Sequence, residues 1–270
     1  MKTREELRRE VEEIENPLDR LLHIMSLLRA KDGCPWDRKQ TLLTLKPYLI
    51  EEAYEVLDAI DEGDAEEHRQ ELGDLLLQVV FQSQLRKEEG AFDFFGVATA
   101  ISDKLLRRHP HIFGDGNADT AEEVLTTWEE VKKSEGRKSL LSGIPKHLPG
   151  LQKAHRIGEK TARVGFDWPD LSGPREKISE ELAELEEATT LKEQRHEVGD
   201  LLMAVVNYAR HLGIDPEEAM QSANERFMQR FSYIEDKMVE LERPMEGASL
   251  EELDRLWEEA KERLESDKNQ

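Results

Sequence analysis

Features that stabilise secreted or membrane proteins are scarce in this sequence of 270 residues. Its single cysteine, Cys34, has no second cysteine to pair with, so an internal disulfide and a Cys-x-x-Cys metal site are both excluded. No apolar run approaches the roughly 18–20 residues needed to cross a bilayer. The charged start from Met1 to Glu6 does not resemble a signal peptide. We therefore expect a cytoplasmic protein with no membrane partner.

Positive charge is outnumbered by negative charge. The chain has 38 Lys and Arg residues against 60 Asp and Glu residues, a formal net charge of −22. Such a surface repels polyanions, so a nucleic-acid polymer is not an expected partner. A single small phosphate ligand brought in by a metal ion remains compatible with this charge. The length allows either one large domain or two smaller ones.

Strand signals are missing, because no segment alternates apolar and polar residues with β-branched enrichment. Apolar residues instead recur at helical spacing, which predicts an all-α fold. One helix should begin near Leu42 or Pro47 and end near Ile60. The pattern predicts further helices over about 65–87, 94–108, 120–134, 151–163, 174–188, 191–212, 216–241 and 249–266. Residues 109–116 are expected to form a loop.

An acidic helical pattern occurs twice. Glu-Glu-x-x-Glu is followed by Glu-x-x-Asp on the next helix in both halves, and the paired acids are offset by 129 and 126 positions. These near-constant offsets indicate two tandem copies of a four- to five-helix unit. Three glycines and two prolines mark the boundary. We expect a first domain over 1–135, a linker over 136–150 and a second domain over 151–270.

The repeated acids are candidate metal ligands. Helical residues three apart share a face, so each pair projects two carboxylates in one direction. If the two helices of a copy are antiparallel, four acids converge and repel one another unless a cation lies between them. Oxygen ligands without Cys, and without His at the matching position, suit Mg²⁺ or Mn²⁺. The competing interpretation is a solvated acidic face. The predicted ligands are Glu52, Glu55, Glu71, Asp74, Glu181, Glu184, Glu197 and Asp200.

A glycine occupies the same interior position of the second acidic helix in both copies. Gly73 and Gly199 each cost about 1 kcal/mol relative to alanine in a helix, which indicates a close helix approach.

Basic and aromatic residues follow each acidic pattern. Lys104 and Arg108 match Arg226 and Arg230 at an offset of 122. Cations four apart share a helical face and could clamp phosphates, or they could form ordinary surface ion pairs. The pair Trp128/Lys132 matches Trp257/Lys261. These tryptophans could stack on a base or fill the core.

Together with the acids, three further motifs carry a family resemblance. They are Cys34-Pro35-Trp36-Asp37, His109-Pro110-His111 and Val164-Gly165-Phe166-Asp167-Trp168. Over residues 16–265 the chain resembles the all-α nucleoside triphosphate pyrophosphohydrolases of the MazG type. The resemblance implies Mg²⁺-dependent hydrolysis of a nucleoside triphosphate to monophosphate and pyrophosphate, which clears nucleotide pools. It also implies a cytoplasmic homodimer.

The resemblance assigns roles to individual residues. The predicted ligands above become the metal set, and Glu181, Glu184, Glu197 and Asp200 the catalytic set, because the second half of this family is usually the active one. The implied nucleotide contacts are Lys177, Arg226, Arg230, Trp257 and Lys261. Tyr48 replaces Lys177 in the first half, which leaves the activity of that half open. The alternatives are a non-catalytic helical scaffold, or a relative specific for dUTP or phosphoribosyl-ATP.

Overall fold

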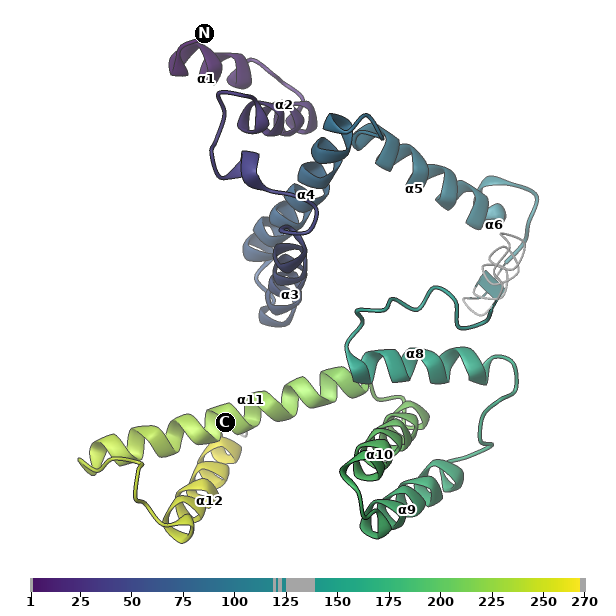
Figure 1. Ribbon diagram of the computed structural model, residues 1–270, viewed down its shortest axis with the longest axis vertical. Coiled ribbons are helices and arrows are strands. Elements are labelled where there is room, and N and C mark those ends of the chain that lie inside the picture. The colour runs from purple at the N-terminus through teal and green to yellow at the C-terminus, as the bar shows by residue number, and fades with distance from the viewer. Residues whose placement is uncertain (1, 119, 121–122, 125–138, 268–270) are drawn as a thin grey trace. The chain divides into compact units, whose positions relative to one another are not determined.

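The computed structural model describes residues 2–118, 120, 123–124 and 139–267, and these contain helices and loops but no strand (Figure 1). The all-α prediction is therefore confirmed. The chain divides into two compact units, Met1–Glu135 and Gly136–Gln270. Much of the helix expected over 120–134, with Trp128 and Lys132, lies outside the described residues.

The helices of the first unit begin at side-chain caps. The Asn16 side chain accepts from the backbone N–H of Leu18 at 2.9 Å, and that of Asp64 accepts from Glu66 at 2.8 Å. Such caps satisfy N–H groups that lack a partner in the first helical turn. The elements are α1 (Arg4–Glu12), α2 (Pro17–Arg29), a 3-10 turn (Asp37–Lys39), α3 (Lys46–Glu62), α4 (Ala65–Glu88), α5 (Phe94–Arg108) and α6 (Pro110–Phe113).

The prediction of a loop over residues 109–116 was wrong in one detail, because this segment contains the short helix α6. Pro110 is its first residue, where the missing N–H costs nothing and the fixed φ favours a helical turn.

The second unit follows the same local rules. Thr190 and Glu193 form a reciprocal capping box, and Asp215 caps the helix that opens with Pro216. The elements are α8 (Gly150–Ala162), α9 (Ser172–Glu187), α10 (Leu191–His211), α11 (Pro216–Glu240) and α12 (Leu250–Asp267).

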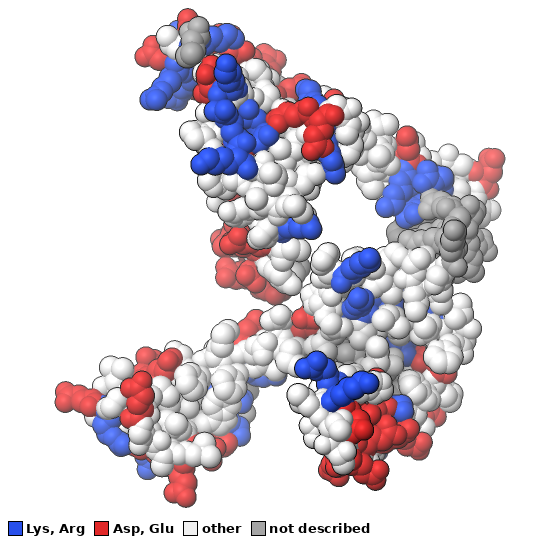
Figure 2. Space-filling view, viewed as in Figure 1, with Lys and Arg blue, Asp and Glu red and all other residues white. Residues whose placement is uncertain are grey.

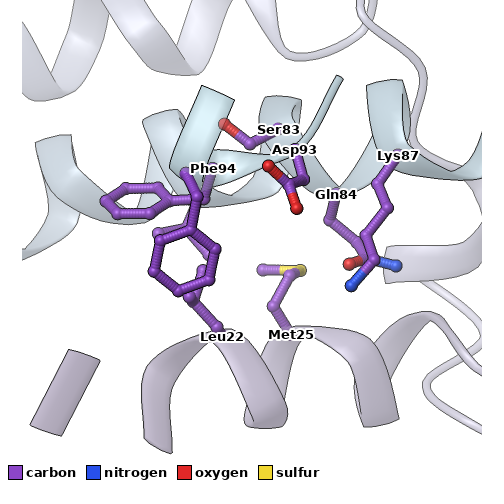
Figure 3. A pocket seen from close by; sticks show the side chains of 9 residues that line it. Leu22, Met25, Ser83, Gln84, Lys87, Asp93 and Phe94 are labelled. Atoms are coloured by element: carbon purple, nitrogen blue, oxygen red, sulfur yellow. The ribbon is translucent and has the colours of Figure 1, made fainter. Parts of the chain in front are cut away.

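The core of the first unit lies where α2 crosses α4. Met25 is buried there with Val80, Phe81 and Leu85. Figure 3 shows Met25 of α2 facing the Gln84 side of α4, beside Phe94 from the start of α5. These residues line a cavity of about 40 Å³, which has room for little more than water and contains none of the predicted metal ligands.

The second unit contains two packed helix pairs, α9–α10 and α11–α12. Among the described elements α9 packs against α10 alone, whereas α12 packs against α11 alone. In addition, α10 packs against α8, and α11 packs against α8 and the end of α10. The α11–α12 pair has its own apolar core of Ile234, Met238 and Leu256. The acids and the cations predicted for one site therefore lie largely on different helix pairs.

The close approach expected at the repeated glycines is not found. A Cβ built on Gly73 or Gly199 would meet no atom within 4 Å. Both glycines face open space in the single chain, so that prediction was wrong.

No helix within the described ranges is long and apolar enough to span a bilayer.

Replacing Met238 by alanine should destabilise the α11–α12 pair. Its side chain is 1% exposed, so truncation leaves a cavity and should lower the free energy of unfolding by about 2–5 kcal/mol. The neighbouring Val239 is 76% exposed, and Val239→Ala should change it by less than about 0.5 kcal/mol. Urea unfolding of the full chain measures both. Equal effects would show that Met238 is not a core residue.

Candidate metal centre

Three acids of the second unit meet between α9 and α10. Glu181 and Glu184 lie one turn apart on α9, and Glu197 faces them from α10. One carboxylate oxygen from each lies within 4.8 Å of the others. We call these three residues the second-unit triad. The α9–α10 packing therefore holds three negative charges together, which favours a bound cation.

Glu181 is the anchor of the second-unit triad. The residue is only 3% exposed, and its Oε2 is buried without a hydrogen-bond partner. Its Oε1 pairs with Lys177 Nζ at 2.6 Å, and Lys177 also bonds Glu180 at 2.9 Å. These two carboxylates raise the pKa of Lys177. A buried carboxylate oxygen without a partner costs free energy, so the donor set fits a divalent cation that would satisfy it.

The pKa of Glu184 is affected by desolvation and by the other two acids of the second-unit triad. Desolvation raises the pKa of the Glu184 carboxyl, and the negative charges of Glu181 and Glu197 raise it further. Lys177 partly offsets this effect. A carboxyl group with a raised pKa is a better proton acceptor near neutral pH than an ordinary glutamate.

Asp200 lies outside the second-unit triad and belongs to an adjoining group. Its carboxylate, that of Glu197 and the imidazole of His196 offer three ligand atoms within 4.8 Å of one another. His196 Nδ1 lies 3.1 Å from Asp200 Oδ2 and 3.3 Å from Glu197 Oε1. The sequence analysis missed His196 because it looked for histidine only three residues after each glutamate. The i, i+4 spacing of His196 and Asp200 was the available signal.

The first unit repeats the acid arrangement. Glu52 and Glu55 of α3 and Glu71 of α4 offer oxygens within 4.8 Å of one another, and we call them the first-unit triad. Asp74 is not in this group, although its charge acts on Glu52. Desolvation raises the pKa of Glu52, and the charges of Asp74 and Glu55 raise it further. Both halves thus place three acids together and the predicted aspartate to one side.

The two triads differ in the polar groups that hold them. The buried amide of Gln78 donates to Glu52 at 3.2 Å, and its own Oε1 has no partner. Alanine stands at the equivalent position of the second unit, Ala204. Tyr48, in the place of Lys177, contacts the Trp36 ring edge-on with centroids 5.9 Å apart. The first-unit triad is therefore supported by an amide, and the second-unit triad by an ammonium.

The remaining predicted nucleotide contacts lie on α11 and α12. Arg230 lies over the Trp257 ring at 5.4 Å, and Arg226 donates to Ser222 at 2.6 Å. Lys261 pairs with Glu258 at 2.8 Å. Trp257 also packs against the α11–α12 core, as its core alternative predicted. Only Lys177, of the five predicted contacts, lies beside the acids within one chain.

Charge is distributed accordingly over the surface. Figure 2 shows Asp and Glu gathered at the end of the α9–α10 pair, with Lys and Arg at the border of the patch. A patch of this kind attracts cations, and its basic border could contact an anion held by them.

Comparison with known proteins gives two family matches, one in each half. Residues 40–113 match the model of the MazG nucleotide pyrophosphohydrolase domain, and residues 158–227 match that of phosphoribosyl-ATP pyrophosphohydrolase. These ranges include both acid triads.

Two of the relatives match almost the full length of the chain, and a third matches about half of it. The chain is 46% identical over 256 residues to a nucleoside triphosphate pyrophosphohydrolase of Escherichia coli K12, covering 91% of this chain and 97% of the relative. It is 45% identical over 246 residues to the nucleoside triphosphate pyrophosphohydrolase/pyrophosphatase MazG of Thermotoga maritima, covering 90% and 95%. A nucleoside triphosphate pyrophosphohydrolase of Mycobacterium tuberculosis is 33% identical over 152 residues, covering 55% and 46%.

Removing one charge from the second-unit triad should stabilise the metal-free chain. A carboxyl whose pKa is raised on folding lowers stability as pH rises from its ordinary pKa, about 4.3, through the raised value. In EDTA at pH 7, Glu184→Gln should therefore raise the melting temperature, and the gain should shrink toward pH 4.

Glu180→Gln is the matched control, because Lys177 already neutralises Glu180 and the substitution removes an ion pair. Calorimetry at both pH values measures the difference. A Glu184→Gln chain that melts lower than wild type at pH 7 in EDTA would contradict the repulsion argument.

Proposed function

Because the chain belongs to the MazG family of nucleotide pyrophosphohydrolases, we propose that it is a Mg²⁺-dependent nucleoside triphosphate pyrophosphohydrolase. The reaction takes a nucleoside triphosphate and water to the monophosphate and pyrophosphate, and so clears nucleotides such as ATP from a cytoplasmic pool. The observation that carries the proposal is the buried, unpartnered Oε2 of Glu181 inside a triad of carboxylates.

Two candidate sites could hold the metal. In the second unit Glu181, Glu184, Glu197 and Asp200 would hold Mg²⁺, with Mn²⁺ as a possible substitute. In the first unit the equivalent residues are Glu52, Glu55, Glu71 and Asp74. Bound Mg²⁺ supplies positive charge to phosphate oxygens and lowers the pKa of a water molecule.

The chain's own groups complete the reaction. The exposed carboxylate of Glu184 accepts a proton from water while the water oxygen bonds to the α-phosphorus. The bond from this phosphorus to the oxygen bridging the β-phosphate breaks, and pyrophosphate leaves with the electron pair. Arg226, Arg230 and Lys261 stabilise the charge on pyrophosphate. Lys177 holds Glu181 in place and neutralises part of the triad's charge.

Nucleoside triphosphates are the favoured substrate class. The phosphoribosyl-ATP model matches only 158–227, whereas the relatives covered over 95% or more of their length are named for nucleoside triphosphates. Phosphoribosyl-ATP and dUTP therefore belong in a substrate panel as alternatives. Diphosphate and phosphate as products would indicate an ordinary phosphatase, and no hydrolysis would favour a helical scaffold.

A homodimer is part of the proposal, because one chain leaves the second-unit site incomplete. The cations of α11 and α12 make no contact with α9 in the part of the chain that the structure describes. The outer face of α10 exposes Val198, Leu202 and Val205 at helical spacing. Phe227 of α11 is 57% exposed. A second copy of this chain would cover these apolar faces and bring its cations to the acids.

Replacing Glu184 by glutamine should lower Mg²⁺-dependent turnover of ATP by about 10²-fold or more, because it removes a ligand and the proposed base. EDTA should abolish wild-type turnover. Release of monophosphate and pyrophosphate by the full chain is the measurement.

Glu55→Gln makes the same change in the first-unit triad and separates the halves. Its loss of turnover measures the share contributed by the first unit. If the Glu184→Gln chain is fully active and the Glu55→Gln chain is inactive, the reaction takes place in the first unit and not in the second.

Mixing two inactive chains tests the shared site. In a Glu55→Gln background, one chain carries Glu184→Gln and the other Arg230→Ala. If acids and cations come from different copies, a mixed dimer contains one intact site. Refolding the chains together at equal amounts should restore about a quarter of the activity of the Glu55→Gln chain, since half of the dimers are mixed. No recovery despite mixed dimers would place both residues in one copy's site.

A further inference from the structure

The segment 164–168 has no role in the proposed reaction, although it is one of the three sequence motifs. It lies between α8 and α9, and Gly165 has a φ of +81°, which residues other than glycine rarely adopt. The Asp167 carboxylate accepts from Arg210 Nη1 at 2.9 Å and lies 3.0 Å from His211 Nε2, at the end of α10. Both partner side chains are 13% exposed, so a largely buried ion pair fixes this loop to α10.

Trp168 follows this ion pair and packs on the start of α9. A Cβ built on Gly173 would lie 2.0 Å from Trp168 Cδ1, so only glycine leaves room for the indole ring there. The same face of α9 continues, at intervals of four, four and three residues, through Lys177, Glu181 and Glu184. Trp168 is 38% exposed. A partly exposed aromatic ring therefore lies on the face of α9 that carries the ammonium and two acids of the second-unit triad.

We infer that Trp168 is a specificity-determining residue, on which the base of the nucleoside triphosphate stacks while the phosphates lie at the acids. The inference rests on the proposed function, because it takes a metal-bound triphosphate as the ligand. Along α9 the order is ring, ammonium and carboxylates, and along the substrate it is base, ribose and phosphates. Glu181 lies eight residues beyond Gly173, about 12 Å along the helix axis. Helical side chains lean toward the N-terminus, which shortens the span that the ribose and α-phosphate fill.

The first unit repeats this arrangement. The spacing Gly-x-x-Trp precedes the acidic helix in both halves. Trp36 contacts Tyr48 at the start of α3, one turn before Glu52 of the first-unit triad. The turn that carries Trp36 is also fixed by a largely buried cation, because Arg29 Nη1 donates to the carbonyl oxygen of Asp37 at 2.5 Å. Each unit therefore holds a loop tryptophan rigidly at the start of its first acidic helix, which lowers the entropy lost when a ligand binds.

Two other interpretations compete with this one. In the first, Trp168 only fills the space between its loop and α9, which explains the packing but not why a tryptophan precedes both triads. In the second, Trp257 is the stacking surface. However, Trp257 packs against the α11–α12 core and Arg230 lies over its ring. Trp168 is also attached to the helix that carries the acids, so it needs no second copy to reach them.

Turnover of two substrates by the Glu55→Gln chain tests the inference, because this background reports the second unit. One substrate is ATP, and the other is ribose 5-triphosphate, which keeps the sugar and phosphates but has no base. Trp168→Ala should raise the KM for ATP about tenfold, as expected for a lost base–aromatic stack, and leave kcat and the KM for ribose 5-triphosphate unchanged. Trp168→Phe should recover part of the loss. Phe166→Ala is the matched control, because it removes a 79% exposed aromatic ring of the same loop and should leave both KM values unchanged.

An unchanged KM for ATP in Trp168→Ala, or an equal loss on both substrates, would overturn the inference. Calorimetry with α,β-methylene-ATP and Mg²⁺ on the same samples separates this failure from failure of the proposed function. If ATP is hydrolysed and neither its KM nor analogue binding depends on Trp168, the function stands and the stacking residue does not. If hydrolysis is absent while Trp168→Ala weakens analogue binding about tenfold, the proposed function fails and the nucleoside contact stands.

Discussion

Repulsion between carboxylates on facing helices is the constraint around which both units are arranged. Each unit joins two antiparallel helices by a short turn, and their packing holds three acids within 4.8 Å. In the absence of an ion, the rest of the fold must offset this repulsion. Desolvation raises the pKa of Glu52 and of Glu184, and the neighbouring negative charges raise it further. A divalent ion would replace this repulsion by attraction, so the proposed metal binding would use the same packing that brings the acids together.

In the two units, different side chains contact the acids of the triads. Gln78 gives Glu52 a neutral donor from the interior, whereas Lys177 gives Glu181 a positive charge from the helix surface. A neutral donor leaves the full negative charge of a triad available to a cation. An ammonium neutralises part of that charge and offers a contact to a phosphate. The units can therefore share a metal-binding design while differing in what they do with a bound nucleotide.

Local signals in the sequence were sufficient for most of the helices and for the grouping of three of the four predicted acids in each unit. The helix Phe94–Arg108 has the predicted bounds, because Pro110 stops the helix shortly after its last residue. The acids met because their spacing fixes the helical face and a short turn fixes the partner helix. The features that the sequence did not predict depend on contacts between residues far apart in the chain. Nothing local shows that Gly73 faces open space, or that Arg230 lies over Trp257. His196 was a local signal, overlooked because only one spacing was considered.

The division between acids and cations separates metal binding from nucleotide binding. One α9–α10 pair holds every predicted donor of the proposed second-unit metal site, so metal affinity should not depend on whether chains associate. The cations that we propose to bind phosphate lie on α11 and α12, which pack apart from α9. If a second copy supplies them, turnover depends on the concentration of chains while metal binding does not. Dilution would then yield a chain that is loaded with metal but inactive, a state that a site contained within one chain could not produce.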